Sequence, residues 1–154
     1  MNTNKSVRLG TGFLLIITLL GMSSFRPSDN KEPELPGIQF FHGSLKEAKA
    51  KAKKEKKLIF IDCYTSWCGP CKSMAKKTFV NKEVGEYFNA NFICVKMDME
   101  KDEGPDVATR YSVEAYPTYL FLDYKGEVKH RDLGFIDAER FIQLGKTAAA
   151  KLQP

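Results

Sequence analysis

Short apolar runs alternate with more polar stretches along the chain from Gly37 onward. The apolar runs are rich in β-branched and aromatic residues and are bounded by turn-forming residues, which is the pattern of β-strands. The run at 58–61 is apolar at every position, as expected of a strand that is buried on both faces of a sheet. Strands are predicted at residues 38–41, 58–61, 92–97, 118–122 and 128–133.

The stretches between these runs predict helices. Ser44 and Glu47 have the Ser-x-x-Glu spacing of a capping box, which predicts a helix that begins there and continues through the following lysines. A second helix is predicted to begin at Gly69–Pro70, because proline fits the first turn of a helix, and to break near Asn81. Further helices are predicted at 83–89, 105–111 and 137–152, and a turn at 123–126. The order β-α-β-α-β-α-β-β-α predicts an α/β fold.

The N-terminus has a different pattern. Lys5 and Arg8 precede an uncharged apolar stretch at 9–22, and small residues follow at the expected cleavage positions. This layout is typical of a secretory signal peptide over residues 1–23. An uncleaved membrane anchor is the alternative, although the apolar stretch is short for a membrane span. The sequence therefore predicts an exported protein in the periplasm or another extracytoplasmic compartment, with a possible N-terminal tether to the membrane.

Composition and charge describe the remainder of the chain. Residues 24–36 are rich in Pro, Asp, Asn, Lys and Glu and predict a flexible linker, and residues 37–154 are expected to form one folded domain. The chain has 154 residues, of which 43% are hydrophobic and 28% charged, as is ordinary for a soluble globular protein. Its formal net charge of +5 is weak. The densest basic run, 46–57, lacks interleaved aromatic residues, so it favours a solvated helix face over an anionic partner, and no nucleic acid is expected.

Cys68 and Cys71 carry the strongest chemical signal, because they lie where a predicted strand gives way to a helix. Residues three apart at a helix start project to one side, so their sulfurs can close a small disulfide ring. Cys68 lies beside unpaired N–H groups and the positive end of the helix dipole, which stabilise a thiolate and lower the pKa of the thiol. The thiolate is the attacking species in disulfide exchange. The pattern therefore predicts Cys68 as the nucleophile and Cys71 as the resolving thiol.

Two other uses of a Cys-x-x-Cys pair are less favoured. A structural zinc site usually needs a second pair of ligands, and the remaining candidates, Cys63, Cys94, His42 and His130, have no paired spacing. A purely structural disulfide is unusual at this spacing. No metal is expected, and redox chemistry is the preferred interpretation.

The residues Trp67-Cys68-Gly69-Pro70-Cys71-Lys72 resemble the active-site motif of the thioredoxin family. Asp62, six residues before the first cysteine, matches the position of that family's buried acid. The sequence 116–118 resembles its cis-proline loop, and Gly126 and Gly134 fall at the turns of its last hairpin. The resemblance covers roughly residues 37–152. It implies a thioredoxin fold, with a central mixed sheet flanked by helices.

The resemblance implies that a buried acid and a lysine assist the cysteines. Asp62 would have a raised pKa because burial disfavours its charge, and it would accept the proton of Cys71 as the mixed disulfide resolves. A capped or solvated aspartate at a strand end is the alternative. Lys96 matches a lysine that pairs with this acid in similar proteins, against an ordinary exposed lysine at a strand end.

The resemblance also implies a substrate-binding set around the cysteines. Pro117 would be cis and leave neighbouring backbone groups free to pair with an extended substrate, against a plain trans proline at a strand start. Trp67 would form an apolar platform at the rim, against simple core packing. Gly69, Pro70 and Tyr116 complete the set. Tyr116 departs from the aliphatic residue that many thioredoxins carry there, which leaves substrate preference open.

The other cysteines and the histidines are expected to have no catalytic role. Cys63 and Cys94 fall in strands that should be neighbours, and buried free thiols are favoured over a second disulfide or a regulatory pair. His42 and His130 are expected at the surface. The stretch 76–84 lengthens the region after the active-site helix, which resembles exported thioredoxin-like domains and the periplasmic domains of disulfide-reductase relays more than compact cytosolic thioredoxin.

The sequence thus predicts a monomeric thiol-disulfide oxidoreductase. The Gly-Pro pair between the cysteines resembles that of reducing members of the family, so we expect reduction of disulfides in cysteine-containing exported proteins. Electrons would come from a membrane donor in a thiol-disulfide relay, because the sequence has no nicotinamide or flavin motif and no cofactor is expected. Net oxidation or isomerisation is a second interpretation, and a redox-silent binding or chaperone module is a third. Peroxide reduction is disfavoured because no Arg/Thr set for peroxide is evident.

Overall fold

The computed structural model describes residues 36–152. The predicted signal segment, 1–23, and nearly all of the predicted linker, 24–36, lie outside the described residues. The strands are β1 (Leu58–Tyr64), β2 (Phe92–Asp98), β3 (Thr118–Leu122) and β4 (Val128–Leu133). The helices are α1 (Leu45–Glu55), α2 (Gly69–Ser73), α3 (Lys82–Asn91), α4 (Gly104–Tyr111) and α5 (Ala138–Ala149), with a π-helix at Met74–Thr78 and a short 3-10 turn at Ala150–Leu152.

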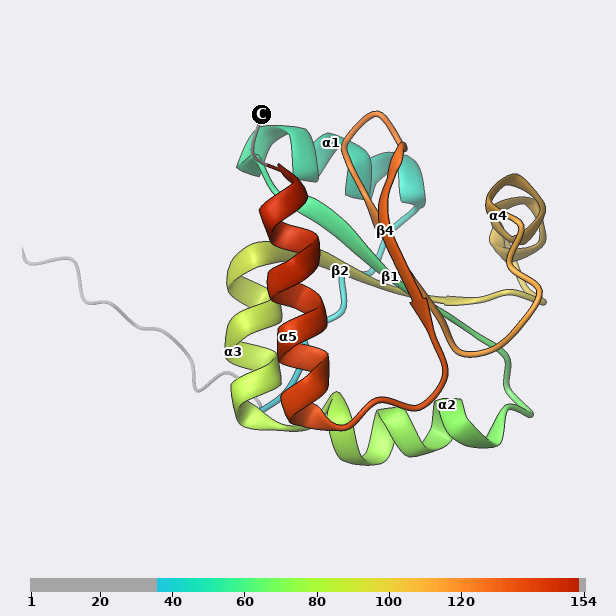
Figure 1. Ribbon diagram of the computed structural model, residues 1–154. Helices are drawn as coiled ribbons and strands as arrows, with labels where there is room; N and C mark the ends of the chain where they lie inside the picture. The colour runs from blue at the N-terminus through green and yellow to red at the C-terminus, as the bar shows by residue number, and fades with distance from the viewer. Residues whose placement is uncertain (1–35, 153–154) are drawn as a thin grey trace, which may run out of the picture. The chain divides into compact units, whose positions relative to one another are not determined.

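The four strands form one mixed sheet in the order β2-β1-β3-β4 (Figure 1). β1 is parallel to β2 and antiparallel to β3, and β3 is antiparallel to β4. The apolar β1 therefore lies inside the sheet with a partner on each side, as its unbroken hydrophobic run predicted. The α/β class and the mixed sheet flanked by helices are confirmed.

Each face of the sheet is covered by its own set of helices. On one face, the buried side chains of α3, α5 and the π-helix pack on the strands around Phe60. Figure 1 shows α3 and α5 side by side on this face, and the rings of Phe88 and Phe141 stack between them at 4.6 Å. On the other face, Leu45 and Ala48 of α1 and Val107 of α4 pack on the alternate residues of the strands. The period of two along β1 thus divides its side chains between two cores.

The predicted strand at 38–41 does not form. Three backbone N–H groups of this segment donate to three different places: to the Phe79 carbonyl at 2.7 Å, the Asn89 side chain at 2.8 Å and the Cys94 carbonyl at 2.7 Å. A strand needs successive bonds to one neighbour. Only the bond to Cys94 reaches β2, so the segment lies beside that edge without extending the sheet.

The helix after the cysteines is more irregular than its sequence predicted. It begins at Gly69, but after five residues it continues as the π-helix Met74–Thr78. The predicted break near Asn81 is confirmed, because this residue caps α3 by accepting the N–H of Val84 at 3.1 Å. At the start of α1, the capping box of Ser44 and Glu47 also forms as predicted.

Replacing Phe60 with alanine is expected to cost about 3–5 kcal/mol of unfolding free energy. The Phe60 ring is fully buried and contacts five other aromatic rings, so its removal leaves a cavity in the middle of one core. Denaturant unfolding of the oxidised protein measures this loss. The control is Val80→Ala, at a position that is half exposed, where a change within about 0.5 kcal/mol is expected. Equal losses in the two variants would contradict the assignment of Phe60 to the centre of the core.

Candidate active site

The two cysteines of the motif form a disulfide at the start of α2. Cys68 is the N-cap residue of this helix, and its Sγ accepts a hydrogen bond from the backbone N–H of Cys71 at 3.1 Å. Both cysteines are only 3% exposed. Gly69 and Pro70 lie on the surface between them, with open space around the glycine. The sulfurs are therefore joined at a helix start, as the spacing predicted, and their catalytic roles stay predictions.

The buried acid and the lysine meet across two neighbouring strands. Asp62 on β1 is the register partner of Lys96 on β2, so both side chains lie on the same face of the sheet. The Lys96 ammonium donates a hydrogen bond to Asp62 Oδ2 and forms an ion pair with it. Asp62 is completely buried, whereas the Lys96 side chain is 28% exposed. The aspartate is therefore not solvated, and the lysine at the strand end is paired and only partly exposed.

Two opposing effects act on the Asp62 carboxyl. Burial raises its pKa above the ordinary value, and the charge and hydrogen bond of Lys96 offset part of that rise. The second carboxylate oxygen, Oδ1, has no hydrogen-bond partner within residues 36–152. This oxygen is thus removed from water, and no hydrogen bond from the described residues replaces the lost hydration. A group in this position can hold a proton at a pH at which a solvated aspartate has lost it.

Trp67 stands at the rim beside the disulfide with 63% of its surface exposed, so core packing is wrong for this residue. Its indole N–H donates to Glu100 Oε1 at 2.9 Å, and its ring makes an edge contact with Tyr116 at 5.9 Å between centroids. Tyr116 precedes Pro117, and the peptide bond between them is cis. Trp67 and Tyr116 therefore form one aromatic surface next to the proline.

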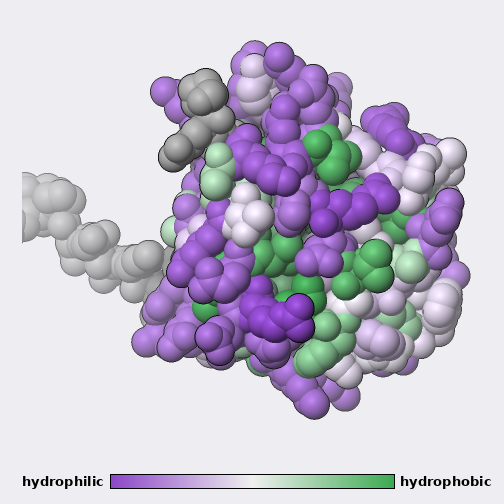
Figure 2. Space-filling model, viewed as in Figure 1, coloured by the Kyte–Doolittle hydropathy of each residue, from purple (hydrophilic) through white to green (hydrophobic). Residues whose placement is uncertain are grey.

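The segment after β4 completes this rim. Sequence analysis noted Gly134 in it but not the exposed residue that follows. Gly134, with a φ of 86°, donates its N–H to the Pro117 carbonyl at 2.9 Å. The next residue, Phe135, is 49% exposed. Behind it, the N–H of Ile136 is 3.3 Å from the sulfur of Met74, which belongs to the π-helix. Figure 2 shows apolar patches among polar side chains in the region of β4 and the segment that leads into α5.

Two signals in the sequence could have pointed to these missed residues. A glycine directly before a phenylalanine, at the exit of the last predicted strand, indicates a turn that exposes the next side chain. An acid shortly after β2, at Glu100, can reach the only indole in the chain. Neither signal shows which residue Phe135 or Glu100 will contact, because those contacts depend on the fold.

The other two cysteines are free and buried. Cys63 packs in the core that α1 and α4 cover, whereas Cys94 packs in the core around Phe60, so the sheet separates them. Burial raises the pKa of both thiols. His42 is exposed as predicted, but His130 is half-buried because its ring lies 5.9 Å from that of Phe121.

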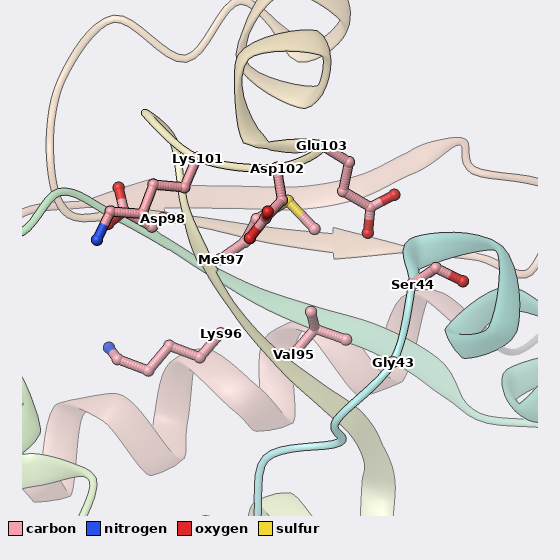
Figure 3. A pocket seen from close by; sticks show the side chains of 9 residues that line it. All are labelled: Gly43, Ser44, Val95, Lys96, Met97, Asp98, Lys101, Asp102 and Glu103. Carbon is pink, nitrogen blue, oxygen red and sulfur yellow. The ribbon is translucent and has the colours of Figure 1, made fainter.

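A separate cleft of about 450 Å³ follows the outer edge of β2 (Figure 3). Its lining includes Lys96 but neither cysteine of the disulfide. Figure 3 shows the Lys96 side chain leading away from Ser44 and Glu103, which line the other end of the cleft. Within residues 36–152 no cluster of acids, cysteines and histidines could hold a metal ion, and no helix is long and apolar enough to cross a membrane.

Replacing Asp62 with asparagine is expected to raise the stability of the oxidised protein at neutral pH. Because the folded pKa of Asp62 is raised, the folded state binds more protons than the unfolded chain between the two pKa values. The contribution of Asp62 to the free energy of unfolding is therefore most favourable below the pKa that this residue has in the unfolded chain. It weakens as the pH rises toward the pKa that Asp62 has in the folded state. The variant should lose this dependence and gain about 1–3 kcal/mol at neutral pH, as measured by denaturant unfolding across the pH range.

Asp123 provides a control, because its pKa is shifted in the direction opposite to that of Asp62. Its Oδ1 accepts three backbone N–H groups in the β3–β4 turn. Burial acts to raise its pKa, but hydrogen bonds from the backbone and from Lys129 lower the pKa overall. Its contribution is therefore present above the unfolded pKa and is lost as the pH falls through the folded pKa. Asp123→Asn should destabilise the protein at neutral pH; a loss of stability in both variants would contradict the desolvation of Asp62.

The comparisons with known proteins agree with this geometry. A thioredoxin-like family model matches residues 41–123. A thioredoxin-like protein of Synechocystis is 36% identical over 87 residues, which make up 56% of this chain and 77% of that protein. A solution structure from Bacteroides thetaiotaomicron, described as a "putative disulphide-isomerase", has 44% identity and a TM-score of 0.66, over 75% of this chain and 95% of that one.

Two further relatives are much longer than the matched region. Chloroplastic thioredoxin Y of Oryza sativa is 35% identical over 91 residues, 59% of this chain but 51% of that protein. The thiol:disulfide interchange protein DsbD of Colwellia psychrerythraea is 31% identical over 102 residues, 63% of this chain but 17% of that protein. The family match takes in β1, the cysteine pair, Asp62 and the cis-proline. The chain spans about half the length of the Oryza sativa relative, and it belongs to the thioredoxin-like family.

Proposed function

We propose that this protein reduces disulfide bonds in exported proteins and is itself reduced again by a membrane-bound thiol-disulfide relay. The observation that carries the proposal is the position of Cys68 Sγ, which accepts the Cys71 N–H at the start of α2. In the dithiol form the same N–H would stabilise a thiolate at Cys68. The exposed Gly69-Pro70 surface leaves room for a client disulfide to approach.

In the first step, the protein and the client become joined by a mixed disulfide. The Cys68 thiolate attacks one sulfur of the client disulfide, the client S–S bond breaks, and its other sulfur leaves as a thiolate that takes a proton from solvent. An extended client segment would lie between the aromatic surface of Trp67 and Tyr116 and the exposed ring of Phe135, beside Pro117. These apolar groups would bind the client without requiring one sequence.

The second step releases the reduced client. Asp62 accepts the proton of Cys71, and the Cys71 thiolate attacks the sulfur of Cys68 in the mixed disulfide. The client sulfur leaves as a thiolate and is protonated, and the Cys68–Cys71 disulfide forms. Two electrons have then passed from the protein's dithiol to the client. The protein in its disulfide form needs a dithiol donor to return these electrons before another cycle.

The pattern of the N-terminus and one relative support the proposed compartment and electron donor. Residues 1–23 have the pattern of an export signal. The chain is similar to part of DsbD, whose name describes thiol:disulfide interchange. We infer that a membrane protein with exchangeable thiols supplies the electrons and that exported proteins with cysteines receive them, with the protein acting as a monomer.

Net oxidation or isomerisation is the second candidate. It is favoured by the Bacteroides thetaiotaomicron structure, whose description names a disulphide-isomerase. The reduction potential of the Cys68–Cys71 pair separates the two candidates. A value near about −270 mV, as in thioredoxin, supports reduction, whereas a value near about −120 mV would favour oxidation.

In the reduced Cys71→Ser variant, the Cys68 thiol is expected to ionise well below the ordinary thiol pKa of about 8.5. The backbone N–H of residue 71 remains in the variant and continues to point at the sulfur. The ultraviolet absorbance of the thiolate, followed against pH, measures this. Burial raises the pKa of Cys63 and Cys94, so these thiols do not interfere. A Cys68 thiol that stays protonated above that ordinary value would overturn the proposal.

The same variant should trap clients, because a serine hydroxyl in place of the resolving thiol cannot break the mixed disulfide on Cys68. Expressed with its own N-terminus in the native compartment, Cys71→Ser is expected to be recovered in disulfides with exported proteins and with one membrane donor. Mass spectrometry after non-reducing separation identifies them. The matched control is Cys94→Ala, which removes a buried thiol from the same domain and leaves the pair intact. Absence of mixed disulfides with Cys71→Ser would contradict disulfide exchange.

A further inference from the structure

The ammonium group of Lys96 lies among three aromatic rings as well as against Asp62. Its Nζ is 4.1 Å from the centroid of the Tyr64 ring, 5.4 Å from that of Phe79 and 5.7 Å from that of Phe40. Within residues 36–152, the contact with Tyr64 is the closest approach of a cation to an aromatic ring. A cation over a ring face at this distance is attracted by the negative face of the ring.

The strand geometry explains why these three groups meet. Asp62 and Tyr64 are two residues apart on β1, so their side chains project from the same face. Lys96 is the register partner of Asp62 on the adjacent parallel strand. Its side chain reaches across the sheet, and its ammonium lies between the Asp62 carboxylate and the Tyr64 ring. Figure 3 shows that this side chain leads away from the far end of the β2 cleft.

The Lys96 ammonium has alternative partners besides Asp62. Its side chain is 28% exposed, so solvent competes for the ammonium. Asp98 lies two residues further along the same face of β2, where its carboxylate accepts the Glu100 N–H at 3.1 Å and pairs with Lys101 at 3.5 Å. An unrestrained lysine would therefore divide its time among Asp62, Asp98 and water. The ring of Tyr64 favours the position at Asp62, because there the cation lies over its face.

We propose that Tyr64 is a positioning residue that holds Lys96 against Asp62 through the face of its ring, and so sets the pH range in which Asp62 can accept a proton. The inference rests on the proposed role of Asp62 as the acceptor for Cys71. The hydroxyl of Tyr64 is not needed for this effect, because the attraction comes from the ring. Phe40 and Phe79 are further away and complete the surroundings of the ammonium.

The other titratable groups near Asp62 are neutral or bonded elsewhere. The register partner of Asp62 on β3 is Tyr119, whose pKa burial raises, so that it is neutral. Cys63 on the same strand is a neutral buried thiol that projects to the opposite face. The cysteines of α2 are joined in the disulfide. Lys96 is therefore the one charged group in hydrogen-bond contact with Asp62 among the described residues.

The test measures the Asp62 carboxyl directly in the oxidised full domain by carbon NMR titration. Tyr64→Phe keeps the ring and should leave the Asp62 pKa unchanged. Tyr64→Leu removes the ring face and should raise the Asp62 pKa by about one unit. In the Lys96→Gln background, where the cation is absent, Tyr64→Leu should cause no further rise. A matched control, Tyr87→Leu, removes a half-buried tyrosine whose ring is in none of the lysine–ring contacts of the described residues, and it should cause no shift.

A graded series of fluorinated phenylalanines at position 64 keeps the shape of the ring and weakens its negative face, so it applies even if Tyr64→Leu does not fold. The Asp62 pKa should rise step by step along this series. No rise, or an equal rise in the Lys96→Gln background, would overturn the inference. The rate at which a Cys68 mixed disulfide resolves is measured in parallel: if the Asp62 pKa moves and the rate profile does not, the positioning role stands and the role of Asp62 as proton acceptor is wrong.

Discussion

The pairing of β1 on both of its edges is the constraint on which the rest of the structure depends. β1 lies between β2 and β3, and its residues from Leu58 to Cys63 are fully buried. A strand in this position cannot slip, because a shift of one residue would exchange the side chains of the two cores. The end of β1 is therefore fixed, and the cysteine pair follows it after a short turn. The hydrophobic run that builds the core thus also determines where the disulfide lies.

The fixed position of β1 also places the Asp62 carboxylate in the core, where it lowers the stability of the folded state. Asp62 continues the face of β1 that contains Phe60, so it must lie on the side of the core around Phe60. Its partner Lys96 comes from β2 because the parallel register aligns the two residues. One oxygen of the carboxylate is paired and the other is not. An unsatisfied buried oxygen of this kind lowers stability, and such a cost is typical of residues that serve chemistry.

Much of the fold was predictable because it depends on local patterns. The apolar run of β1, the capping box of α1 and the break at Asn81 each involve residues close in sequence. The segment 38–41 has the composition of a strand, but its backbone bonds go to three different elements, and composition contains no information about distant partners. The π-helix after α2 has no sequence signal of its own.

In the candidate site, too, local features were predictable from the sequence and contacts between distant residues were not. The cysteine pair was found because it lies where a predicted strand gives way to a helix, and Asp62 was found because its position six residues before Cys68 resembles that of the family's buried acid. Glu100 reaches Trp67 across 33 positions, and Phe135 is brought beside the cis-proline by a bond from Gly134 to Pro117. These contacts come from separate elements that meet only in the folded domain. Sequence reasoning can name residues capable of such contacts, but the sheet order decides which of them meet.

The partial exposure of Lys96 bears on how a buried acid can act in a redox cycle. A lysine buried as deeply as Asp62 would hold the carboxylate charged and make it a poor acceptor for a proton. With no lysine, nothing would offset the rise in the Asp62 pKa that burial causes. A lysine that is 28% exposed and is held by a ring lies between these limits, because solvent screens part of its charge. On this proposal the ring of Tyr64 matters to the acid because it keeps the charge of Lys96 next to the carboxylate.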